Sequence, residues 1–139
     1  MGDANGASAA TIEFEHVSKH YDAATLKSGA PGAVDDLSLT VPAGRICVLV
    51  GPSGCGKTTT LKMVNRLIEP SSGRILVDGV EIAGQDVTEL RRSIGYVIQQ
   101  VGLFPHQSIA ENVSTVPRLL GWGRDKQRAR ADELLAIVG

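Results

Sequence analysis

The stretch from Gly51 to Thr59 constrains the possible folds of this chain more than any other part of it. It fits the pattern G-x-x-x-x-G-K-[ST] at every required position. The apolar segment 45–50 comes before it and indicates a buried strand. Residues 57–68 come after it and indicate a helix whose apolar positions are Leu61, Val64, Leu67 and Ile68. A strand, a glycine-rich loop and a helix in this order predict an α/β fold with a phosphate-binding loop.

The residue types in this loop suit a nucleotide's polyphosphate. Glycines let the backbone curl without a Cβ in the way, so that successive N–H groups converge on one point. The helix that follows directs its positive N-terminal end at the same point. Lys57 adds a charge for the outer phosphates, and the Thr58 hydroxyl is placed to bind Mg²⁺. The predicted nucleotide-binding residues are Gly51, Pro52, Ser53, Gly54, Cys55, Gly56, Lys57, Thr58 and Thr59; the competing interpretation is a chance glycine-rich turn.

Composition narrows the function classes. The chain has 139 residues, 42% apolar, with a formal charge of −1, which suits one globular domain and offers no electrostatic case for nucleic acid as a partner. Its longest apolar run, 46–50, is too short to span a bilayer. Residues 1–10 lack the features of a secretory signal and predict a disordered tail. Cys47, in the predicted strand, and Cys55 match no metal or disulfide framework and indicate reduced thiols in a cytoplasmic protein.

Two alternating segments come before the loop. In 11–17 the residues Ile12, Phe14 and His16 share one face, and Glu13, Glu15 and Val17 share the other, which predicts a half-buried strand. A loop rich in Ala, Gly and Ser follows over 22–31. In 36–41 the alternation returns, with Leu37, Leu39 and Val41 inward. We expect the two strands to pair antiparallel.

Further elements follow the first helix, which we expect to stop at Pro70. Segment 74–78 predicts a strand that turns at Asp78–Gly79 into a hairpin. Asp86 begins a short helix, and 93–98 predicts another buried strand. Ser108 and Glu111 form a capping box that opens a helix. From Asp125 onward a last amphipathic helix carries one apolar face, made of Ala131, Leu134, Leu135 and Val138.

Residues 94–106, which begin within the second predicted buried strand, run Ile-Gly-Tyr-Val-Ile-Gln-Gln-Val-Gly-Leu-Phe-Pro-His. Together with the loop Gly-Pro-Ser-Gly-Cys-Gly-Lys-Thr-Thr-Thr, they make the chain resemble the ATP-binding subunit of an ABC transporter from Ile12 to Gly139. Segments 61–70 and 97–100 look most like the importers of quaternary amines such as glycine betaine, carnitine and choline. The resemblance implies a P-loop NTPase fold of the ABC type, with N-terminal antiparallel strands and a RecA-like core that is incomplete at the C-terminus.

The resemblance also implies roles for single residues. Tyr21 matches the aromatic ring that stacks on adenine, with His20 as the competing ring. Gln99 matches the glutamine that meets Mg²⁺ and the attacking water, so Lys57 and Gln99 are the catalytic candidates, and Thr58 and Gln99 the Mg²⁺ ligands. A membrane permease subunit would dock on Leu103, Phe104, Pro105 and His106. The alternative interpretations are a solvent-facing tyrosine, a polar residue at a strand end and a plain loop.

Other motifs of the family do not occur in these residues. The signature loop Leu-Ser-Gly-Gly-Gln, the acidic pair after a further strand and the switch histidine are all missing. We therefore expect 11–139 to be the N-terminal part of a nucleotide-binding domain, ending at the start of its helical subdomain. Such a chain should bind nucleotide without turnover, and its unpaired backbone at 46–50 should pair with another copy.

Within the family, two subunits enclose two ATP molecules and drive permease subunits that receive solute from a substrate-binding protein. The resemblance thus implies a homodimer on the cytoplasmic face of the plasma membrane, with ATP and Mg²⁺ and without nucleic acid. Three alternatives stay open. One is another phosphate-loop class such as a small-molecule kinase; the second is a non-catalytic fragment that docks on a permease; the third is an importer ATPase for another solute.

Overall fold

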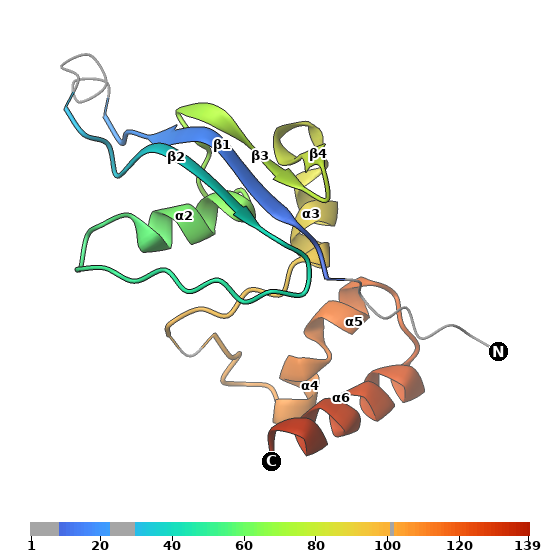
Figure 1. Cartoon of the computed structure of the whole chain (residues 1–139). Coiled ribbons are helices and arrows are strands. Elements are labelled where there is room, and N and C mark those ends of the chain that lie inside the picture. Colours follow the sequence, from blue (N-terminus) through green and yellow to red (C-terminus); the bar gives the residue numbers. More distant parts are fainter. Residues whose placement is uncertain (1–8, 23–29, 101) are drawn as a thin grey trace. The chain divides into compact units, whose positions relative to one another are not determined.

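Figure 1 shows the computed structural model, which describes residues 9–22, 30–100 and 102–139. Most of the predicted N-terminal tail and most of the predicted loop 22–31 lie outside the described residues. Where the composition indicates one globular domain, the chain forms two compact units, one up to Ile94 and one from Gly95 to Gly139.

The first unit is built on a four-stranded antiparallel sheet in the order β2-β1-β3-β4. The predicted antiparallel pairing of the first two strands is confirmed. The predicted hairpin is confirmed as well, because Asp78 and Gly79 have φ angles of 50° and 73° and join strands that pair through Val77 and Val80. The strands are β1 (Ile12–Lys19), β2 (Val34–Val41), β3 (Ser72–Val77) and β4 (Val80–Glu81).

A bulge in β1 changes which residues face the core. The register with β2 shifts between Phe14 and Val17, and His16 between them has a φ of 49°. The extra residue turns His16 to solvent and brings Val17 inward until it is 0% exposed. The predicted faces are therefore wrong after Phe14. In β2 the prediction is confirmed, since Leu37 and Leu39 are half-buried and pack against the core.

Helices α2 (Lys57–Val64) and α3 (Val87–Ser93) lie on the same face of the sheet (Figure 1). A short 3-10 helix, η1 (Ile82–Gly84), comes between β4 and α3. Asp86 caps α3 as predicted, because its carboxylate accepts hydrogen bonds from the N–H groups of Thr88 and Glu89. These elements and the sheet bury one apolar cluster, made of Phe14, Val17, Val34, Met63, Ile75, Ile82 and Leu90.

The apolar face predicted for the first helix is confirmed only in part, since Val64 and Ile68 pack against the core but Leu61 and Leu67 are exposed. Leu61 is 54% exposed, whereas Met63 is 0% exposed and lies in the core. The helix ends at Val64, and Arg66 has a φ of 53°, so that the chain has left the helical path before Leu67. The periodicity predicted from 57–68 therefore joins residues that belong to two different backbone segments.

Neither of the two predicted buried strands forms. Segment 45–50 has no regular secondary structure and pairs with no strand among the described residues, and Ile46 and Val50 are 94% and 88% exposed. Cys47, expected to be buried, is exposed too. In the second predicted strand Val97 is 94% exposed. An apolar strand is buried only when neighbours supply its ladder of hydrogen bonds on both sides, and neither segment has them here. Association of 46–50 with another copy stays a prediction.

Among its described residues the second unit has three helices, which follow a segment without regular secondary structure. The predicted capping box is present, because Ser108 Oγ accepts from the Glu111 N–H and the Glu111 carboxylate accepts from the Ser108 N–H. Ala131 is fully buried as predicted, but Val138 at the end of the last helix is 78% exposed. None of the helices in the described ranges is long and apolar enough to cross a membrane. The helices are α4 (Ile109–Val113), α5 (Thr115–Leu119) and α6 (Arg124–Val138).

Candidate nucleotide-binding site

The loop before α2 takes a conformation that requires glycine. Gly54 and Gly56 have φ angles of 82° and 86°, in the left-handed region that residues with a Cβ rarely adopt. A Cβ on Gly56 would also lie 2.1 Å from the Ala33 carbonyl oxygen. The loop backbone therefore lies directly against the segment before β2. The sequence does not predict that Ala33 lies beside the loop, because the two segments in contact are far apart along the chain.

The N-terminus of α2 is left open by its own sequence. Gly56 at the N-cap offers no side chain to bind the first N–H groups, and the first turn carries no acidic residue. The two other helices with clear caps are closed, α3 by Asp86 and α4 by Ser108. Uncapped N–H groups at the positive end of a helix favour an anion. The start of α2 therefore has the backbone chemistry of a phosphate site.

Lys57 spans the loop. Its ammonium Nζ donates hydrogen bonds to the carbonyl oxygens of Gly51 at 2.8 Å and Pro52 at 2.6 Å, and to Cys55 Sγ at 3.1 Å. These bonds use all three donors of the ammonium. The lysine charge is therefore held over the loop itself, where an incoming phosphate would exchange with these acceptors.

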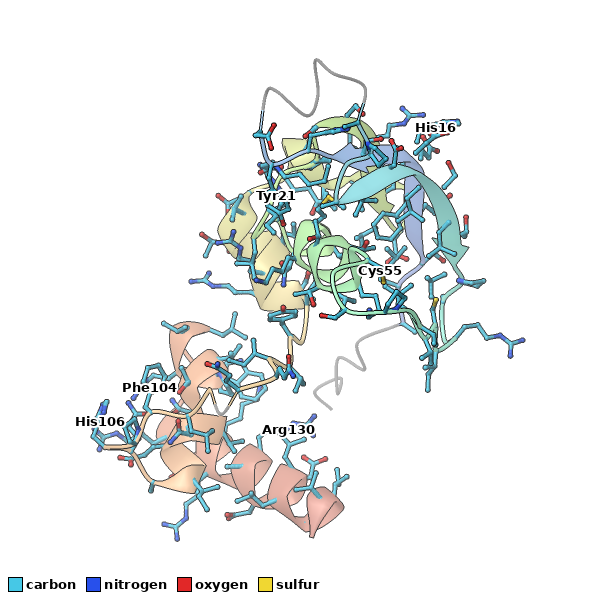
Figure 2. The ribbon with its side chains drawn as sticks, turned by 90° about the vertical axis from the view of Figure 1, so that its left-hand side faces the viewer. His16, Tyr21, Cys55, Phe104, His106 and Arg130 are labelled. Carbon is cyan, nitrogen blue, oxygen red and sulfur yellow. The ribbon has the colours of Figure 1, made fainter. Side chains whose placement is uncertain are left out.

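A cavity of about 370 Å³ opens beside the loop, lined by Ala33, Tyr21 and the residues from Ser53 to Thr59. The structure thus brings Tyr21 to the loop, with its hydroxyl 2.9 Å from Thr59 Oγ1 and Lys19 Nζ 5.5 Å from the ring centre. His20, the competing ring, is turned inward, and its Nδ1 is buried. Tyr21 is the ring available to a ligand in this cavity, and Figure 2 shows it in the same unit as Cys55.

The lining of this cavity suits the predicted ligands. Among the described residues it carries one ammonium, from Lys57, and no carboxylate. Its hydroxyl groups come from Tyr21, Ser53, Thr58 and Thr59. Donors and a single positive charge match the negative phosphates of ATP, and a Thr58 hydroxyl is a suitable oxygen ligand for Mg²⁺. The residues present therefore fit both a nucleotide and its metal ion.

Cys55 should be the more reactive of the two exposed cysteines. The hydrogen bond and charge of Lys57 hold the pKa of its thiol below the usual range, so that the reactive thiolate persists to lower pH. In a Cys47→Ser variant, iodoacetamide should label Cys55 with a pH profile shifted below that of a free thiol, and Mg-ATP should protect it. Cys47 outside this cavity, tested in Cys55→Ser, should gain no protection from Mg-ATP. Equal protection of both thiols would contradict this placement of the nucleotide.

The other predicted site residues belong to the second unit. Gln99 is exposed and lies between α3 and α4, outside any strand. Leu103 and Phe104 are exposed, and the Phe104 ring lies edge to face against His106 with ring centres 6.0 Å apart. Figure 2 labels both residues in the second unit. The structure presents these residues on the surface, and their roles in catalysis and docking stay predictions.

Comparison with known proteins identifies the family. The family model described as ABC transporter matches residues 34–139, which cover β2, the loop, all the helices and the segment with Gln99. This chain belongs to the ABC transporter family. The family shares the P-loop NTPase fold predicted above, and the N-terminal antiparallel strands agree with it.

Known members resemble the chain over most of its length. The osmoprotectant import ATP-binding protein OsmV of Salmonella typhimurium is 54% identical over 128 residues, 91% of this chain and 33% of that protein. The glycine betaine/carnitine/choline transport ATP-binding protein OpuCA of Bacillus subtilis is 54% identical over 91% of this chain and 32% of its own length. The ADP- and phosphate-bound dimer of the ATP-binding cassette MJ0796 matches with a TM-score of 0.74 and 28% identity over 90% of this chain and 56% of that one. This chain thus spans about a third of the length of OsmV and of OpuCA.

Proposed function

We propose that this chain is the N-terminal part of the ATP-binding subunit of an ABC importer for an osmoprotectant or quaternary amine. The observation that carries the proposal is the cavity where the open N-terminus of α2, Lys57 and the Tyr21 ring meet. The solute class rests on the relatives with 54% identity, which are named for osmoprotectant, glycine betaine, carnitine and choline transport.

In this proposal the chain's residues hold the nucleotide in three ways. The Tyr21 ring stacks on adenine, an interaction that contributes about 1–3 kcal/mol per base. The loop N–H groups and Lys57 bind the phosphates and stabilise charge on the transferring phosphoryl group. By the family resemblance Thr58 and Gln99 would hold Mg²⁺, which would neutralise phosphate charge, and Gln99 would help to position the attacking water. The exposed segment 103–106 docks on a permease subunit, and a second copy of the subunit completes the dimer at the cytoplasmic face of the membrane.

In this proposal the chain binds ATP but does not hydrolyse it, and a measurement of phosphate release distinguishes the two activities. The 139-residue chain should release phosphate from Mg-ATP no faster than the buffer does, because the acidic residues that would polarise the water do not occur in it. Mg-ATP should nevertheless raise its melting temperature. Steady-state hydrolysis by the pure chain that is lost in Lys57→Ala would contradict the proposal that this chain binds ATP without hydrolysing it.

A chimera tests the transport role. Residues 12–139 should replace the matching segment of Bacillus subtilis OpuCA and restore glycine betaine uptake in cells that lack that protein. The same chimera with Lys57→Ala should be produced at equal level and give no uptake. A chimera that binds ATP but supports no uptake would contradict the proposal and favour a non-catalytic nucleotide-binding segment.

A further inference from the structure

The side chain of Asn112 closes the loop that comes before α4. Its Oδ1 accepts a hydrogen bond from the Phe104 N–H at 2.7 Å. Its Nδ2 donates to the carbonyl oxygens of Phe104 at 3.2 Å, Gln107 at 3.2 Å and Ser108 at 3.0 Å. Two amide hydrogens are shared among these three acceptors. One side chain from the helix thus holds both ends of the turn from Phe104 to Ser108.

Only an amide of this size satisfies these partners. The backbone N–H needs an acceptor, and the three carbonyls need a donor, so the orientation of the Asn112 amide follows from its partners. Aspartate has the same shape but would place a carboxylate oxygen against the carbonyls, where charge and lone pairs repel. Asn112→Asp replaces the amide nitrogen by an oxygen and therefore changes the hydrogen bonds of this side chain while its volume stays nearly the same.

The turn held by Asn112 presents apolar surface. Leu103 and Phe104 are exposed, and the Phe104 ring lies edge to face against His106. The Gln107 N–H donates to the Phe104 carbonyl at 3.1 Å, which closes the turn. The turn leads directly into α4, whose N-terminus is closed by the capping box at Ser108. Exposed apolar side chains on a fixed turn are pre-organised for a partner, because less conformational entropy is lost on binding.

We propose that Asn112 is a positioning residue that fixes the turn 104–108 in the shape in which it docks on a membrane permease subunit. The partner surface is an apolar cytoplasmic segment of that subunit, which would cover Leu103 and Phe104. This inference rests on the proposed function, since it assumes that 103–106 is the docking surface. Asn112 acts through the turn and need not touch the partner.

Hydrogen exchange tests the positioning role. In Asn112→Ala the amide of Phe104 should exchange at least tenfold faster, because its acceptor is removed, whereas the amides in the middle of α6 should keep their protection. Asn112→Asp keeps an acceptor for this amide but loses the donor to the three carbonyls, so it should raise the exchange rate of the Phe104 amide by a smaller factor. Ser108→Ala is the matched control: it weakens the cap of α4 and should leave the Phe104 amide protected. Unchanged exchange at Phe104 in both Asn112 variants, or a loss of protection throughout the unit, would overturn the proposal.

Binding to the solubilised permease subunit of the same transport system, measured with the full-length ATP-binding subunit, gives the functional readout. Asn112→Asp and Phe104→Ala should each weaken binding at least tenfold, with ATP affinity unchanged. If Phe104→Ala weakens binding and both Asn112 variants do not, the positioning role is wrong and the docking surface stands. If Phe104→Ala has no effect, the docking surface itself is wrong, and the positioning role fails with it.

Discussion

Replacing Lys57 by alanine should abolish the rise in melting temperature that Mg-ATP produces. The ammonium lies over the loop with three hydrogen bonds to it, so it is in place to exchange these for phosphate oxygens. A hydrogen bond to a charged group contributes about 1.5–3 kcal/mol, which corresponds to a loss of affinity of about 10- to 100-fold. A ligand that binds only the folded state raises stability by RT ln(1 + [L]/Kd), so at a nucleotide concentration near the parent chain's Kd a loss of this size leaves almost no shift.

The matched control for this change is Lys62→Ala. Lys62 lies on the same helix but does not line the cavity. Lys62→Ala removes one positive charge, as Lys57→Ala does. Its thermal shift with Mg-ATP should equal that of the parent chain. Melting without ligand separates a loss of affinity from a loss of folding in both variants. A thermal shift retained by Lys57→Ala would contradict the role assigned to this lysine.

Replacing Met63 by alanine should lower the free energy of unfolding by about 2–5 kcal/mol. Met63 is fully buried between α2 and the sheet, in the cluster that also holds Phe14 and Ile75. The change leaves a cavity that a packed core fills only in part. Because domains of ordinary size are stable by only about 5–15 kcal/mol, this is a large share of the total. Urea denaturation followed by circular dichroism should show a lower midpoint with an unchanged slope.

Leu61→Ala is the control on the same helix. Leu61 is half-exposed, and the sequence pattern predicted it as a core position in place of Met63. Surface substitutions of this kind change stability by about 0.5 kcal/mol or less. Equal losses in the two variants would show that α2 packs by the face predicted from periodicity and would contradict the structure.

The features that depend on neighbouring residues were predictable. The phosphate loop, the hairpin at Asp78–Gly79 and the capping box at Ser108 are each encoded within a few residues, because backbone conformation and capping act locally. The short helix α5 was not predicted. Of the candidate site, the loop followed from the sequence pattern and Tyr21 from the resemblance to the family, whereas the contact of Tyr21 with Thr59 was not predicted.

The features that depend on distant residues were not predictable. Whether 45–50 becomes a buried strand is decided by the strands beside it, and its own composition cannot supply them. The bulge at His16 was missed although Val17 breaks the alternation of Ile12 and Phe14, because one break in a short segment does not show whether an extra residue is inserted there. The hydrogen bond between the Phe104 N–H and the Asn112 side chain was not predicted either, since the sequence around an asparagine in a short helix does not show which loop its side chain binds.

The amide resonances of the loop test the central claim most directly. Mg-ADP titrated into the ¹⁵N-labelled chain should produce saturable, one-to-one shifts in the backbone amides from Gly54 to Thr58, the groups proposed to bind phosphate. Amides in the middle of α6 should not move, and Lys57→Ala should need far more nucleotide for the same effect. Loop amides that stay unshifted at saturating nucleotide, or shifts confined to other segments, would contradict the account.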